Sequence, residues 1–126
     1  MKESINIKNA PSPVGPYSQA VIHNNVMYAS GQIAINPKNG ELINNDVKKE
    51  LVQILDNIDS LLEAANIKRN HILKCSIFLK NMNDFDAVNE LYADYFDPPF
   101  PARETIEVAR LPKDVNIEIS FVASLD

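Results

Sequence analysis

The chain lacks several features that would point to common kinds of protein function. Its single cysteine, Cys75, cannot form an internal disulfide, and its position in the apolar run 72–79 favours a small buried side chain over a nucleophile. The two histidines, His23 and His71, have no cysteine or acidic partner at ligand spacing, so exposed histidines are favoured over a metal site. A glycine-rich phosphate loop and a Ser-His-Asp set are also missing. Hydride, phosphoryl and metal chemistry are therefore disfavoured.

Long apolar runs and an excess of positive charge are absent as well. No stretch approaches the roughly 20 apolar residues of a membrane span, and residues 1–6 lack the apolar core of a signal peptide, so we expect a cytoplasmic protein. Twelve basic and seventeen acidic side chains give a formal net charge of -5, and the basic residues are scattered. This charge pattern disfavours nucleic acid as a partner.

The size and composition are typical of one soluble globular domain, which we place at residues 1–126. Hydrophobic residues make up 45% of the chain and charged residues 23%. A chain of 126 residues is long enough to bury roughly two-thirds of its unfolded surface in a single core.

Hydrophobic periodicity predicts the order β-β-α-β-α-β-β. Residues 17–33 read as two strands around Asn24-Asn25, a pair suited to a tight hairpin turn. A helix of about 20 residues begins near Asn45 or Asp46, which can cap it, and ends near Asn66. A buried strand at 72–79, a helix from about 84 to 96 and two strands within 101–121 complete the order.

Two amphipathic helices of this kind must cover a sheet, so the sequence predicts a two-layer α+β domain with a mixed sheet covered on one face. In the strand at 26–33, alternation places Met27, Ala29, Gly31 and Ile33 on one side. In the strand at 72–79 it places Leu73 beside Cys75, Ile77 and Leu79. Because the strand at 26–33 carries apolar groups on both sides, we expect the free face of the sheet to self-associate.

The segment 101–119 carries most of the functional information. We interpret it as two neighbouring strands joined by a Leu-Pro-Lys-Asp turn, with Arg103 at the start of the first and Glu118 on the polar face of the second. An arginine can hold a carboxylate through two parallel hydrogen bonds. The alternative for Arg103 is a surface ion pair with Glu104 or Glu107, and the alternative for Glu118 is a solvated side chain.

Four further positions are candidates for a site. Tyr17 follows a rigid Gly-Pro bend, and the Ser30-Gly31 pair inside a strand either allows close approach to the backbone or marks a bulge. Asn89 lies on the second helix, where it either reaches a ligand or caps local backbone groups.

These motifs resemble those of the RidA family of imine deaminases over residues 9–123. The matching stretches are 15–20, 29–33, 83–85 and above all 101–119. The resemblance implies a chorismate-mutase-like fold and a homotrimer with active sites at the subunit interfaces. It also implies hydrolysis of 2-imino acids, released by pyridoxal-phosphate enzymes, to 2-keto acids and ammonia, without metal or cofactor.

The resemblance assigns roles residue by residue. Arg103 would bind the substrate carboxylate and Glu118 would orient or activate water. The resemblance also implies that the pocket would be lined by Tyr17, Ser30, Asn89 and the backbone at Gly31 and Thr105. Two departures are Thr105, often cysteine in relatives, and Glu104, often serine, which we expect to point away from Arg103.

Two other functions remain open on the sequence alone. A non-catalytic trimer that binds small carboxylates and regulates a partner would need Arg103 but not Glu118. Nucleic-acid binding or cleavage is disfavoured by the acidic balance.

Overall fold

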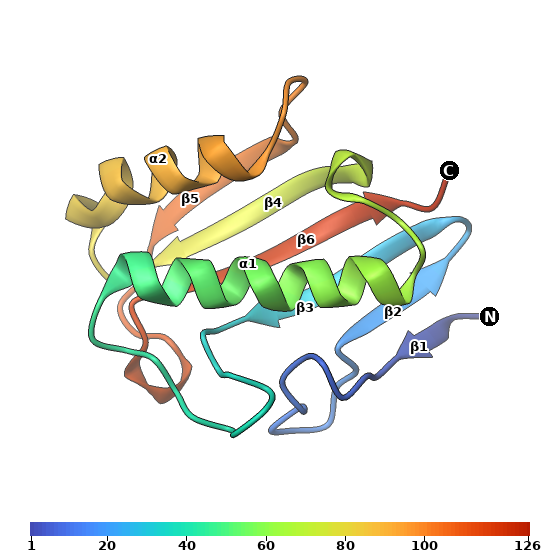
Figure 1. Cartoon of the computed structure of the whole chain (residues 1–126), viewed down its shortest axis with the longest axis horizontal. Helices are drawn as coiled ribbons and strands as arrows, with labels where there is room; N and C mark the ends of the chain where they lie inside the picture. The colour runs from blue at the N-terminus through green and yellow to red at the C-terminus, as the bar shows by residue number, and fades with distance from the viewer.

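The computed structural model describes all residues 1–126 and contains one six-stranded sheet with two helices on the same face (Figure 1). The elements in chain order are β1 (Glu3–Ile5), β2 (Ala20–His23), β3 (Val26–Gln32), α1 (Val47–Ala64), β4 (Ile72–Leu79), α2 (Phe85–Tyr95), β5 (Ala102–Glu107) and β6 (Ile117–Ser124). This arrangement confirms the predicted two-layer α+β class. None of the helices is both long enough and apolar enough to cross a membrane.

The strands lie in the order β1-β2-β3-β6-β4-β5, and only the β4–β5 pair is parallel. The prediction that β5 and β6 are neighbours is wrong, because β4 lies between them. The crossover through α2 places β5 beside β4 in parallel, and the chain then returns to fill the gap between β3 and β4 (Figure 1). The short strand β1 was not predicted, since its three residues are mostly exposed and show no apolar run.

The predicted turn and cap residues have the expected backbone geometry. Asn24 and Asn25 have φ values of 49° and 67°, which suits the hairpin between β2 and β3. Asp46 caps α1 by accepting from the amides of Lys48 and Lys49, and Asn66 follows the helix with φ of 57°. The sequence therefore determines these boundaries locally.

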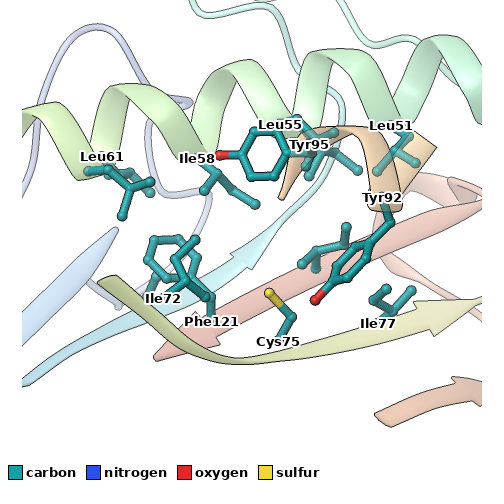
Figure 2. Packing of buried hydrophobic residues seen from close by; sticks show 14 of the residues in the cluster. Leu51, Leu55, Ile58, Leu61, Ile72, Cys75, Ile77, Tyr92, Tyr95 and Phe121 are labelled. Carbon is teal, nitrogen blue, oxygen red and sulfur yellow. The ribbon is translucent and has the colours of Figure 1, made fainter. Parts of the chain in front are cut away.

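The core lies between the helices and the covered face of the sheet (Figure 2). Leu51, Ile54, Ile58 and Leu61 of α1 are at most 1% exposed, as the helical periodicity predicted. Burying each large aliphatic side chain contributes about 1.5 to 3 kcal/mol to folding. Cys75 is 1% exposed within this core, which agrees with its interpretation as a small buried side chain.

Two irregularities shift residues away from their predicted faces. The register of β3 against β6 changes between Ala29 and Gln32, so Gln32, not Gly31, is buried on the core side. A similar shift in β4 after Ile72 leaves Leu73 50% exposed, although alternation placed it in the core. Strict alternation fails at both points because the strand gains an extra residue relative to its partner.

A buried carboxylate joins α1 to the start of β6. Glu50 is fully buried and accepts hydrogen bonds from the backbone amide of Asn116 at 2.9 Å and from its side-chain amide at 2.6 Å. These two bonds fix the chain just before the strand that carries Glu118.

Candidate active site

Glu118 lies on the face of the sheet that the helices leave free. Along β6, residues 117, 119, 121 and 123 are buried against the helices, and Glu118 alternates with them. A pocket of about 350 Å³ opens around its carboxylate. The lining residues are Val14, Tyr17, Ser30, Gly31, Ile33, Pro112 and Glu118. Tyr17 from one predicted motif and the Ser30-Gly31 pair from another thus line the same pocket as Glu118.

Gly31 gives the Glu118 carboxylate its space. A methyl group at residue 31 would lie 2.5 Å from Glu118 Oε2, closer than any ordinary contact. The bulge in β3 turns Gly31 toward this free face. Both explanations offered by the sequence therefore apply, since the bulge is present and the glycine permits a close approach.

The environment of Glu118 changes its acidity. Partial burial raises the pKa of its carboxyl above the ordinary value, because the charged form loses solvation. A carboxyl shifted in this direction is better matched to proton exchange near neutral pH than an exposed one.

Ser30 and Gln19 hold the segment that carries Tyr17. The Ser30 hydroxyl donates to the backbone carbonyl of Ser18 at 2.7 Å, and the Ser30 amide donates to the Gln19 carbonyl at 2.9 Å. Because its proton is already used, the Ser30 hydroxyl can offer a ligand only acceptor capacity. Tyr17 is 48% exposed and lines the pocket.

We call Tyr17, Ser30, Gly31 and Glu118 the Glu118 cluster. A second group of residues, on β5 and α2, forms the Arg103 cluster: Phe85, Asn89, Tyr92 and Arg103.

Arg103 is held by neutral side chains only. Its Nη1 donates to Asn89 Oδ1 at 2.7 Å, and its guanidinium carbon lies 5.0 Å from the centre of the Tyr92 ring and 5.6 Å from that of Phe85. No ion pair in the structure includes Arg103. The guanidinium therefore keeps both its charge and most of its donors for a ligand.

The acidic neighbours of Arg103 are occupied elsewhere. Glu104 points to the opposite face, as expected, where it forms an ion pair with Lys74 at 3.0 Å and a hydrogen bond with Ser76. Glu107 accepts from the backbone amide of Met82. The alternative that Arg103 is paired with Glu104 or Glu107 is thus wrong.

Thr105 lies two residues after Arg103 and on the same face of β5. Its hydroxyl oxygen is buried and has no hydrogen-bond partner. The strand β5 ends the sheet, so one side of its backbone near Thr105 has no strand partner.

A single chain does not bring Arg103 and Glu118 together. Arg103 faces the helix-covered side of the sheet, Glu118 faces the free side, and β4 separates their strands. The sequence prediction placed them on neighbouring strands and did not foresee this separation. It also missed Tyr92 and Phe85 as partners of Arg103, although both were assigned to the inner face of the helix. No cluster of three His, Cys, Asp or Glu side chains is arranged to hold a metal ion.

Comparison with known proteins identifies the family. A family model described as endoribonuclease L-PSP matches residues 7–125. A 2-iminobutanoate/2-iminopropanoate deaminase from Escherichia coli is 46% identical, with 98% of each chain covered. The chain belongs to the RidA family.

Other members of the RidA family match over nearly the whole chain. A RutC family protein from Pyrococcus horikoshii is 50% identical over 98% of both chains. Among solved structures, a Rid family protein of unknown function from Yersinia pestis has a TM-score of 0.95 and 49% identity, covering 98% of this chain and 99% of that one. The family includes proteins named as deaminases and proteins named by family only, so membership alone does not fix the reaction.

Proposed function

We propose that this protein hydrolyses small 2-imino acids to 2-keto acids and ammonia, as a homotrimer and without a metal or cofactor. The observation that carries the proposal is a pair of charged side chains, Arg103 and Glu118, neither of which forms an ion pair within the chain. Arg103 has no acidic partner, and the carboxyl of Glu118 has a raised pKa beside an accessible pocket. Such groups suit a substrate that carries a carboxylate next to an electrophilic carbon.

The proposed mechanism needs only positioning and proton transfer. Arg103 binds the substrate carboxylate, and Glu118 orients a water molecule and takes one of its protons. The water oxygen bonds to the imine carbon, the C=N bond becomes single, and Glu118 returns the proton it took to the nitrogen. The new hydroxyl then gives its proton to the nitrogen by way of Glu118, the C=O bond forms and the C–N bond breaks, giving ammonia and the 2-keto acid. An imine carbon is already electrophilic, so moderate acid-base assistance suffices.

The binding site would be completed by Tyr17, Ser30, Gly31, Asn89 and the backbone of Thr105. The Ser30 hydroxyl can accept a hydrogen bond from the imine nitrogen, because its own proton is bonded to Ser18. The apolar side chains of Val14, Ile33 and Pro112 at the pocket favour a substrate with a small aliphatic group.

The homotrimer is proposed because the site is divided between two faces of the sheet. Joining the Arg103 cluster of one subunit to the Glu118 cluster of the next would unite all predicted residues. The free sheet face also exposes apolar side chains, since Tyr28 is 48% and Ile106 45% exposed. A repeated head-to-tail contact forms a closed ring when its rotation closes, and a ring of three subunits would contain three such sites.

The test uses 2-iminobutanoate, generated in the cuvette by a threonine dehydratase, and follows 2-ketobutyrate above the spontaneous rate. We expect the wild-type protein to accelerate the reaction and Arg103→Ala to abolish the acceleration. Lys80→Ala, which removes an exposed cation elsewhere, is the control and should remain active. Absence of acceleration by the wild type across several imino acids would reject the deaminase.

The alternative is a trimeric regulator that binds small carboxylates without catalysis. It is favoured by one observation, namely that the Arg103 cluster is complete within one chain. Binding of 2-ketobutyrate that depends on Arg103, with no acceleration of imine hydrolysis by the wild type, would support this alternative. If the wild type is a deaminase, an unchanged rate in Glu118→Ala would remove Glu118 from the mechanism. The endoribonuclease description belongs to the family model, and the formal charge of -5 gives it no support here. A cytoplasmic location stays a prediction.

A further inference from the structure

Three residues of α2, Phe85, Asn89 and Tyr92, contact the Arg103 guanidinium, and we call them the support of Arg103. Two of them, Phe85 and Tyr92, are not among the proposed site residues. The side chain of Tyr92 is 6% exposed, yet its ring lies 5.0 Å below the guanidinium carbon of Arg103. Phe85 adds a second ring at 5.6 Å and Asn89 binds one guanidinium nitrogen. The guanidinium is thus held from the side of α2.

Every group in this support is neutral. Burial raises the pKa of the Tyr92 phenol far above its ordinary value, so the ring carries no charge in the pH range of activity. Burial also raises the pKa of Cys75, which lies beside the Tyr92 hydroxyl, to about 11 (Figure 2). An acidic partner would compete with the substrate for Arg103, whereas an aromatic face attracts the guanidinium without neutralising it.

The Tyr92 hydroxyl itself takes no part in this support. It points toward Cys75, away from the helix, and has no hydrogen-bond partner of good geometry (Figure 2). The ring is therefore the part of Tyr92 that acts on Arg103.

We propose that Tyr92 is a positioning residue, whose ring, together with Phe85 and Asn89, orients the Arg103 guanidinium for carboxylate binding before the ligand arrives. An arginine fixed in this way loses less side-chain freedom on binding, which increases affinity. The inference rests on the proposed carboxylate site, so its test includes one measurement that needs no ligand.

The first measurement is the affinity for 2-ketobutyrate by titration calorimetry. Tyr92→Met keeps an apolar side chain but removes the ring, and we expect binding about threefold to tenfold weaker. In the deaminase assay this variant should raise KM more than it lowers kcat. Tyr92→Phe keeps the ring and should restore tight binding.

Tyr95→Met is the matched control. Tyr95 lies on the same helix, is 8% exposed and stacks on Arg69 at 3.9 Å, but it does not contact Arg103. Its variant should lose stability without losing affinity. If Tyr95→Met weakens binding as much as Tyr92→Met, the effect is general destabilisation and the proposal is wrong.

The second measurement follows the Arg103 Nε–H signal by NMR in the ligand-free protein. We expect a ring-current shift and restricted motion in the wild type, and loss of both in Tyr92→Met. If Tyr92→Met does not fold, Phe85→Leu at a half-buried position should reduce the shift partially. An unchanged signal in the folded variants overturns the inference. If the signal changes but the wild type binds no carboxylate, the support is real and the proposed function fails.

Discussion

The Glu118 cluster and the Arg103 cluster are held in place by different means. Glu118 lies against the backbone of Gly31 in a half-buried pocket, where even one added methyl group would collide with it. Arg103 is exposed at the edge of the sheet and is held by side chains of one helix. The first arrangement suits a group that must act on one atom, and the second suits a group that must grip an anion. Changes in the two clusters should therefore separate catalysis from binding.

The largest expected effect is that of Glu118→Ala on catalysis. Removing a positioned acid-base group costs typically 10²-fold to 10⁴-fold in rate, so we expect kcat to fall by about that range. Affinity for 2-ketobutyrate should stay within about threefold of the wild type, because Arg103 still binds the carboxylate. Steady-state kinetics and calorimetry on the same preparation test this. Equal losses of rate and affinity would mean that Glu118 contributes to ligand binding as well as to catalysis, so the two clusters do not have separate roles.

Gly31→Ala should have the next largest effect. The new methyl group lies 2.5 Å from Glu118 Oε2, so the carboxylate must move. A displacement of this size at a reacting group lowers kcat by roughly tenfold to a hundredfold. The control is Gly40→Ala, where φ is 73° and no atom lies within 4 Å, so stability falls without an effect on kcat. An active Gly31→Ala enzyme would show that the position of Glu118 is not critical.

Mixed trimers give a smaller but more specific effect. Arg103→Ala and Glu118→Ala chains should each be inactive alone. If each site takes Arg103 from one subunit and Glu118 from another, random mixing leaves about a quarter of the sites intact. Unfolding the two variants together and refolding them should thus restore about a quarter of the wild-type activity. Mass spectrometry should confirm that the refolded trimers contain both variants. If such mixed trimers recover no activity, each site takes Arg103 and Glu118 from the same chain.

The smallest expected effect is on stability. The pKa of Glu118 is raised on folding, so the folded state binds more protons than the unfolded state between the two pKa values. The stability contributed by this group is then greatest below its unfolded pKa of about 4.3 and falls as pH rises through its folded pKa. Glu118→Gln removes this dependence. Its Tm should equal or exceed that of the wild type at pH 7, and the gap should narrow near pH 4.

The sequence predicted what depends on local pattern. The periodicity of α1, the Asn24-Asn25 hairpin and the Asp46 cap are each decided by residues close in the chain, and the structure confirms all three. The resemblance to RidA proteins added the family. Together these gave the layers of the fold and the identity of the candidate residues.

The local sequence pattern does not determine which strands pair when they are distant in the chain. Nothing in the sequence of β6 says that it enters between β3 and β4, and this insertion is what puts Arg103 and Glu118 on strands that do not touch. The bulges in β3 and β4 depend on partner strands that are distant in sequence. The helical pattern correctly predicted that Tyr92 is buried. Its contact with Arg103 could not be predicted in this way, because it requires β5 to lie beneath α2.

The edge position of β5 has a consequence for solubility. An unpaired strand at the end of a sheet can recruit a strand from another molecule and begin aggregation. Here β5 is only six residues long and carries Arg103, Glu104 and Glu107, charges that discourage such pairing. These charges protect the unpaired edge of β5 from pairing with strands of other molecules.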